Sequence, residues 1–156
     1  MKHKGDKMTH KIEKELNFLL TSTDKMMSNN FTRKLKDEGI NITFEQYTIL
    51  TILWDNKDLC QYNLAKLTGR DEASTSRIIN TLIKNEFIVR QTCITDKRIR
   101  RIKLTKKGES IKNTVLNISN KCLNEAITGM SQKEYEDGIN FLDNLRKNLN
   151  NINSND

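Results

Sequence analysis

The sequence predicts a mainly α-helical chain with one small β-hairpin, and three observations lead to this fold class. Apolar residues recur at helical spacing along most of the 156 residues. Two short helical segments meet at a glycine-containing turn around Gly69, as in a helix-turn-helix. Two β-branched segments, FIVRQTCIT and RRIKLT, follow that pair and are typical of the strands of a hairpin. A helix-turn-helix followed by a hairpin predicts a winged-helix lobe, here flanked by longer terminal helices.

The first part of the chain predicts two helices. Apolar residues from Ile12 to Leu35 follow one helical stripe, and Gly39 is placed to end that helix. Thr43 and Gln46 then have the spacing of a capping box, in which each side chain bonds the backbone N–H of the other residue. The following segment, FEQYTILTILWDN, is apolar on most sides and therefore predicts a buried central helix.

The helix-turn-helix occupies the middle of the chain. The short helix NLAKLT ends at Gly69, and Asp71 is a good N-cap for the next helix, roughly Glu72 to Asn85. The apolar residues of that second helix fall on one face. The opposite face carries polar side chains, including Ser74 and Arg77, and is the face available to a partner.

The predicted hairpin has its tip at ITDKRI. Ile102 and Leu104 should point to one side of the second strand, and Arg101 and Lys103 to the other. The apolar side chains then anchor the hairpin to the helices while the basic ones face outward.

Two further helices complete the prediction. Thr105 caps a long helix that runs to about Ile127, and Ser131 with Glu134 forms a second capping box before the last helix. The terminal helices are long and amphipathic, and one small chain offers them too little surface to pack against. We therefore expect them to pack on a second copy of the chain.

Basic residues are concentrated in one segment. The chain has a net charge of +7, and the window from Lys84 to Lys107 holds nine basic and two acidic residues, which accounts for all of it. A neutral body with one basic segment is the electrostatic pattern of a phosphate-binding surface. The alternative is a solvated basic face without a partner.

Several classes of protein are disfavoured by the sequence. The N-terminus has no apolar signal-peptide core, and no apolar run approaches the roughly 18 residues of a membrane span. We therefore expect a cytoplasmic protein without a membrane partner. Cys60, Cys93 and Cys122 are scattered, which argues against a disulfide framework or a structural zinc site. The sequence contains no P-loop, G-x-S-x-G or H-E-x-x-H motif, so we expect neither an enzyme nor a bound metal or cofactor.

Three stretches carry a resemblance to a known family: LCQYNLAKLTG, DEASTSRIINTLIKNEFIVR and DKRIRRIKLTKKG. In this order they resemble the helix-turn-helix, recognition-helix and wing segments of the MarR family of bacterial transcriptional regulators. The resemblance implies a single MarR-like domain over 1–156, with a DNA-binding lobe at about 43–108 and dimerisation helices at about 8–38 and 109–150. It further implies a homodimeric repressor that binds a palindromic operator in double-stranded DNA.

The resemblance also assigns DNA-binding residues. Ser74, Ser76 and Arg77 fall on recognition-helix positions, Arg98 on the minor-groove arginine of the wing, and Asp96 on the acid that orients it. A helix fits the major groove, and a narrow A·T minor groove attracts an inserted arginine. Each residue has an ordinary alternative: a helix cap for Ser74, a solvated arginine for Arg77, and a simple turn acid for Asp96.

Phosphate contacts are expected on either side of the recognition helix. Gln61 and Tyr62 stand at the start of the preceding helix, and Arg100, Arg101 and Lys103 lie on the second strand. Contacts of this kind add affinity that depends on salt rather than on base sequence.

Two residues depart from the family pattern. Ala73 stands where the family often has Ser, which removes one hydroxyl contact. Glu86 stands where the family often has Gly, which suggests that the turn into the hairpin is made here without a positive φ angle.

Regulation is predicted only in outline. The family often binds small anionic aromatic compounds between the lobe and the dimer helices, and a set of apolar residues could line such a site: Phe18, Met26, Tyr47, Trp54 and Leu116. The alternative is that these residues are ordinary core. A thiol switch at Cys60 or Cys93 is a second route, since each lies beside positive charge or a helix start.

Two rival functions remain open. The chain could be a constitutive architectural DNA binder, or a winged-helix module that binds another protein. A DNA reader should lose affinity when Arg98 or Arg77 is replaced by alanine, whereas a protein-interaction module should tolerate both changes.

Overall fold

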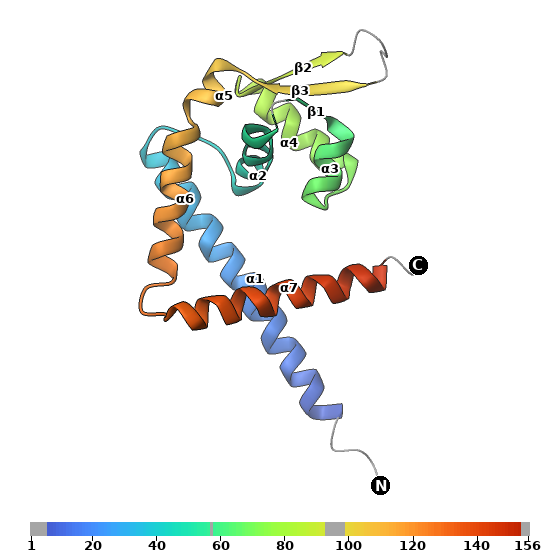
Figure 1. Ribbon diagram of the computed structural model, residues 1–156, viewed down its shortest axis with the longest axis vertical. Helices are drawn as coiled ribbons and strands as arrows, with labels where there is room; N and C mark the ends of the chain where they lie inside the picture. The colour runs from blue at the N-terminus through green and yellow to red at the C-terminus, as the bar shows by residue number, and fades with distance from the viewer. Residues whose placement is uncertain (1–5, 57, 93–98, 154–156) are drawn as a thin grey trace. The chain divides into compact units, whose positions relative to one another are not determined.

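The computed structural model describes residues 6–56, 58–92 and 99–153, with side chains described from Glu15 onward in the first helix (Figure 1). The chain forms two compact units, Met1–Asn120 and Lys121–Asp156. The first unit contains the predicted helix-turn-helix and hairpin.

The first two helices are α1, Asp6–Asp37, and α2, Phe44–Asp55. The predicted capping box is confirmed: the Gln46 N–H donates to the Thr43 hydroxyl oxygen at 3.3 Å, and the Thr43 N–H donates to Gln46 Oε1 at 3.1 Å. The predicted end of α1 is also confirmed, because Gly39 adopts a left-handed φ of 73° just beyond it. These boundaries follow from local chemistry alone.

The predicted central helix is α2, and it forms the middle of the first unit. Three of its apolar side chains are fully buried: Ile49, Leu50 and Leu53. At its first turn, the ring of Tyr47 lies 4.7 Å from that of Phe31 on α1, measured between centroids. This aromatic contact joins α1 to the lobe.

The helix-turn-helix consists of α3, Gln61–Thr68, and α4, Glu72–Lys84. Gly69 turns the chain between them with a left-handed φ of 64°. Asp71 caps α4 as predicted, since its Oδ1 accepts the Ser74 N–H at 2.7 Å. Helix α4 is anchored in the core by its buried face: Thr75, Ile79 and Leu82.

The sheet has three strands rather than the two of a simple hairpin. Strand β2, Ile88–Thr92, pairs antiparallel with β3, Arg100–Leu104, and the short β1, Leu59–Cys60, covers the other edge of β3. Figure 1 shows this sheet beside α3 and α4. Ile102 is fully buried, as predicted for the inward face of the hairpin, whereas Leu104 is half-buried. Its tip, residues 93–98, lies outside the described residues.

The prediction for Glu86 is wrong. Glu86 has a φ of 63°, in the left-handed region that usually selects glycine. The reason is the way α4 ends: the Glu86 N–H bonds the Ile83 carbonyl at 2.9 Å, and the Phe87 N–H bonds the Leu82 carbonyl at 3.0 Å. This pair of bonds is a Schellman motif, and it requires a left-handed residue at this position whatever side chain it carries.

The helix predicted from Thr105 to about Ile127 is interrupted. Helix α5 covers Lys106–Ser110, and α6 covers Lys112–Ala126, with a turn at Ile111 between them. The predicted Thr105 cap is present, as its hydroxyl accepts the Gly108 N–H at 3.0 Å. The Gly108 carbonyl accepts the Trp54 indole N–H at 3.0 Å. This hydrogen bond joins α5 to the buried Trp54 just before the turn at Ile111.

The second unit holds α7, Gln132–Asn153. Its predicted capping box is confirmed: the Ser131 N–H donates to Glu134 Oε2 at 2.8 Å, and the Glu134 N–H donates to the Ser131 hydroxyl at 3.2 Å. Within the described ranges, no helix has both the length and the apolar character needed to cross a membrane.

Candidate nucleic-acid interface

The exposed side of α4 is the centre of the candidate interface. Opposite its buried residues, Arg77 and Asn80 are exposed, and Ser76 is half-buried beside them. Residues at this spacing share one helix face. The predicted recognition-helix residues Ser76 and Arg77 are therefore on the accessible side of the helix.

Ser74 has a defined role at the start of α4. Its hydroxyl donates to Asp71 Oδ2 at 2.7 Å, while its backbone N–H donates to Asp71 Oδ1 at 2.7 Å. These two bonds, the backbone one first, lower the pKa of the Asp71 carboxyl, which stays ionised at neutral pH. The Ser74 hydroxyl proton is thereby committed to Asp71, and its oxygen can still accept a hydrogen bond from a partner.

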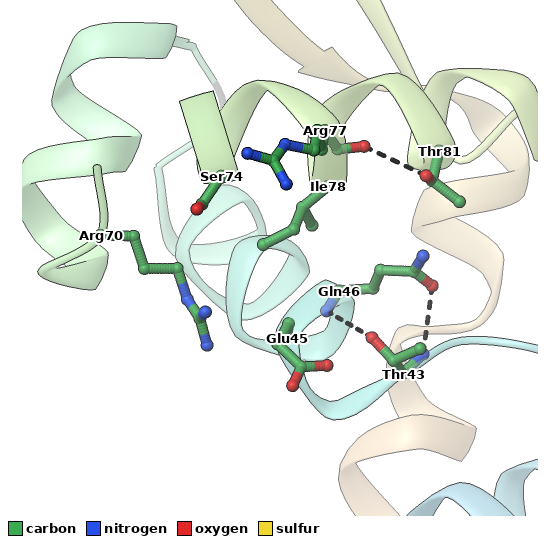
Figure 2. Close-up of a pocket in the computed structure, with 8 residues that line it drawn as sticks. All are labelled: Thr43, Glu45, Gln46, Arg70, Ser74, Arg77, Ile78 and Thr81. Carbon is green, nitrogen blue, oxygen red and sulfur yellow. Dashed lines mark hydrogen bonds between the residues drawn. The ribbon is translucent and has the colours of Figure 1, made fainter. Parts of the chain in front are cut away.

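A hollow of about 310 Å³ lies between α4 and the start of α2 (Figure 2). It is lined by Thr43, Glu45, Gln46, Arg70, Ser74, Arg77, Ile78 and Thr81. Arg70 comes from the turn between α3 and α4, and Arg77 from α4 itself, so two exposed arginines border the hollow. Arg70 is absent from the sequence prediction, although a cation directly after the turn glycine was a signal for it.

Glu45 is the acid in this hollow. A hydrogen bond from the Thr43 side chain is the main cause that lowers its pKa, and nearby Arg70 lowers it further. The carboxylate therefore stays charged and offsets part of the positive charge of the two arginines.

A second hollow, of about 270 Å³, brings together three of the predicted phosphate contacts. Gln61 and Tyr62 line it from the start of α3, and Arg100 lines it from β3, together with Cys60, Glu72 and Ile99. The side chain of Tyr62 is 62% exposed. Residues about forty positions apart in the sequence thus share one surface beside α4.

The basic residues of β3 divide between two environments. Arg101 pairs with Asp58 at 3.1 Å, and Lys103 lies 3.8 Å from the same carboxylate oxygen. Arg100 alternates with them along the strand and faces the second hollow instead. Of the three expected phosphate contacts on this strand, Arg100 is the one without this acidic neighbour.

Asp96, Arg98 and Cys93 lie outside the described residues. Their predicted roles in the wing therefore stay predictions. Cys60 is half-buried at the edge of the second hollow.

The candidate ligand residues occupy different environments. Phe18 and Met26 are 70% and 71% exposed on α1, whereas Trp54 is only 5% exposed. The Tyr47 hydroxyl shares a hydrogen bond with the Ser119 hydroxyl at 3.0 Å, and Leu116 is half-buried on α6. The two hollows described above are lined by residues outside this candidate set.

Known proteins share both the sequence pattern and the fold. Residues 42–99 match the sequence model of the MarR family. The transcriptional regulator SlyA is 25% identical, with 88% of this chain and 93% of that chain covered and a TM-score of 0.72. Reduced AbfR, solved bound to DNA, is 20% identical over 92% of this chain and 97% of its own, with a TM-score of 0.75.

A further match is BpsR of Bordetella bronchiseptica, whose DNA binding is regulated by 6-hydroxynicotinic acid. It is 17% identical over 85% of this chain and 98% of its own, with a TM-score of 0.75. The likenesses to AbfR and BpsR show a shared fold.

Proposed function

Because the chain belongs to the MarR family of transcriptional regulators, we propose that it is a cytoplasmic, homodimeric repressor that binds a palindromic operator and is released by a small ligand. The observation that carries this proposal is the surface around α4. Two hollows lie beside this helix, and each contains at least one exposed basic side chain.

In the proposed complex, α4 enters the major groove of double-stranded DNA. Ser74, Ser76 and Arg77 contact base edges there, since an arginine and hydroxyl groups can match the donors and acceptors of a base pair. The buried face of α4 packs into the core of the lobe. This support favours precise placement of the reading side chains.

The flanks of α4 supply the phosphate contacts of the proposal. Gln61, Tyr62 and Arg100 share one hollow and would bind the sugar-phosphate backbone next to the groove. Arg98 would insert into the minor groove, held extended by Asp96, as the family pattern implies.

The terminal helices support the proposed homodimer. Helix α1 exposes Phe18, Leu19 and Met26, and α7 exposes Ile139, Phe141 and Leu149, each by half or more. So many large apolar side chains exposed on these two helices favour burial against another copy. A symmetric dimer presents two α4 helices, and these fit an operator with two related half-sites.

Release by a small ligand rests on the likeness to BpsR, which 6-hydroxynicotinic acid regulates. We propose an aromatic or anionic ligand for this chain as well, with Phe18, Met26, Tyr47, Trp54 and Leu116 as the candidate lining. The exposure of Phe18 and Met26 leaves both accessible in the single chain.

The test begins with selection of high-affinity duplexes from a randomised DNA library. Fluorescence anisotropy then compares the best selected duplex with a scrambled one. We expect at least roughly a thousandfold preference and a steep salt dependence. Arg77→Ala should weaken binding to the selected duplex by about tenfold to a hundredfold, the usual value of a base contact.

The matched control is Lys133→Ala, which removes an exposed charge from α7 and should leave the affinity unchanged. Equal, weak binding to both duplexes would instead favour an architectural DNA binder. Absence of binding to either duplex would favour a protein-interaction module.

A further inference from the structure

Arg90 joins three elements of the lobe. It lies on β2, and its Nη2 donates to Gln61 Oε1 at 3.1 Å and to Asn80 Oδ1 at 2.9 Å. Gln61 is the first residue of α3, and Asn80 lies on the exposed side of α4. One guanidinium nitrogen therefore bridges the hairpin to both helices of the helix-turn-helix.

The partial burial of Arg90 and its two bonds limit how much of its guanidinium can reach DNA. Its side chain is half-buried, and its Nε is fully enclosed without a hydrogen-bond partner in the described part of the chain. These two bonds use both hydrogens of Nη2, and Nε is enclosed, so only the hydrogens of Nη1 remain for a further contact. The geometry therefore favours an indirect role.

The two bonds fix the orientation of two side-chain amides. An amide has one acceptor oxygen and one NH₂ donor group, and in both Gln61 and Asn80 the oxygen is used by Arg90. The NH₂ groups remain as the donors for a partner. Gln61 lines the second hollow with Tyr62 and Arg100, and Asn80 lies three residues beyond Arg77 on the same helix face.

We infer that Arg90 is a positioning residue for DNA recognition. It holds α3, α4 and the hairpin in fixed positions relative to one another. It also orients the Gln61 and Asn80 amides so that their NH₂ groups can donate to phosphate oxygens and to the acceptors of base edges. This inference rests on the proposed DNA-binding function. A single ammonium group lacks the planar fork of a guanidinium, so lysine should replace it only in part.

The first experiment measures binding of the full chain to the selected duplex and to scrambled DNA at several salt concentrations. Arg90→Gln should raise the Kd for the selected duplex about tenfold or more and change the Kd for scrambled DNA less than about twofold, with an unchanged salt slope. Arg90→Lys should recover part of the lost preference. Asn80→Ala should show a smaller loss of the same kind.

Arg100→Gln provides the contrast, because it removes an exposed predicted phosphate contact. It should raise both Kd values alike and reduce the salt slope by about one. If Arg90→Gln behaves in the same way as Arg100→Gln, Arg90 is itself a phosphate contact and the positioning role is wrong.

The second experiment is hydrogen exchange on the DNA-free protein, which tests the bridge without reference to DNA. Arg90→Lys and Arg90→Gln should both accelerate amide exchange around Asn80 in α4 and at the start of α3, with little change in α7. Unchanged protection at these amides would overturn the inference. If the wild-type chain selects no duplex, the proposed function fails, and exchange alone decides whether Arg90 holds the three elements together.

Discussion

Helices α2 and α7 both begin with a capping box, but they differ in the exposure of their apolar side chains. After its Thr43 cap, α2 buries Ile49, Leu50 and Leu53 completely. After its Ser131 cap, α7 leaves Phe141 52% exposed and other large apolar residues similarly open. The comparison teaches that a helix can be fixed locally while its large apolar side chains stay exposed. The lobe has its own core, whereas α7 supports the proposal of a second copy.

The largest expected effect is a substitution that destabilises the lobe without changing any residue of α7. A Cβ added at Gly108 would lie 2.1 Å from the Phe87 carbonyl oxygen, a backbone atom that cannot move freely. We expect Gly108→Ala to lower the free energy of unfolding by about 3 kcal/mol, because the close contact between α5 and the start of β2 must open. Urea denaturation of both proteins measures this difference.

Gly138→Ala is the matched control on α7. Among the described atoms, none lies within 4 Å of a Cβ at Gly138. Alanine is favoured over glycine inside a helix by about 1 kcal/mol, so this variant should be neutral or more stable. If Gly108→Ala is as stable as wild type, the backbone around Phe87 can shift to make room for the methyl group at little cost in free energy.

The next effect concerns the exposed apolar face of α7. Phe141→Glu places a charge on this face without removing any buried contact of the lobe. We expect the dissociation constant of the proposed dimer to rise about a hundredfold, since burying an unpaired charge at an interface is costly. Sedimentation equilibrium measures this change, and an unaltered dimer would mean that the interface lies elsewhere.

The smallest expected effect separates the two capping boxes by pH. Hydrogen bonds from the Ser131 N–H and hydroxyl lower the pKa of Glu134 below its ordinary value of 4.5. A carboxylate with a lowered pKa in the folded state stabilises that state above its unfolded pKa, and the stabilisation is lost as the pH falls through the folded value. The start of α7 should therefore fray as the pH falls below this ordinary value. The start of α2 should respond less, because neither Thr43 nor Gln46 titrates there and only the neighbouring Glu45, which accepts a hydrogen bond from Thr43, does.

Amide exchange at Tyr135 and Tyr47, followed by NMR against pH, distinguishes the two helix starts. Glu134→Gln keeps a hydrogen-bonding side chain that does not titrate, so its exchange profile at Tyr135 should lose this pH dependence. An identical profile in wild type and variant would contradict the role of the Glu134 charge.

The features that the sequence predicted well are those set by neighbouring residues. The caps at Thr43, Asp71 and Ser131 each require a side chain and an N–H three residues away, and all three are present. The buried face of the hairpin at Ile102 follows from simple alternation. Such signals do not depend on the rest of the chain.

The features that the sequence did not predict depend on contacts between distant segments. Strand β1 has two residues, too few for alternation, and exists because it pairs with β3. The left-handed Glu86 follows from the way α4 ends. In the candidate site, the basic residues of β3 looked alike, and only the fold shows that Asp58 faces Arg101 and Lys103.

The hydrogen bond between Trp54 and Gly108 has a practical consequence for experiments. Trp54 is the one tryptophan of the sequence, and its indole is buried in the lobe with its N–H bonded to the Gly108 carbonyl. Tryptophan fluorescence therefore comes from one side chain that is largely shielded from solvent. A red shift of this emission should follow the unfolding of the lobe. Fluorescence without any added dye can therefore separate unfolding from dissociation of the proposed dimer.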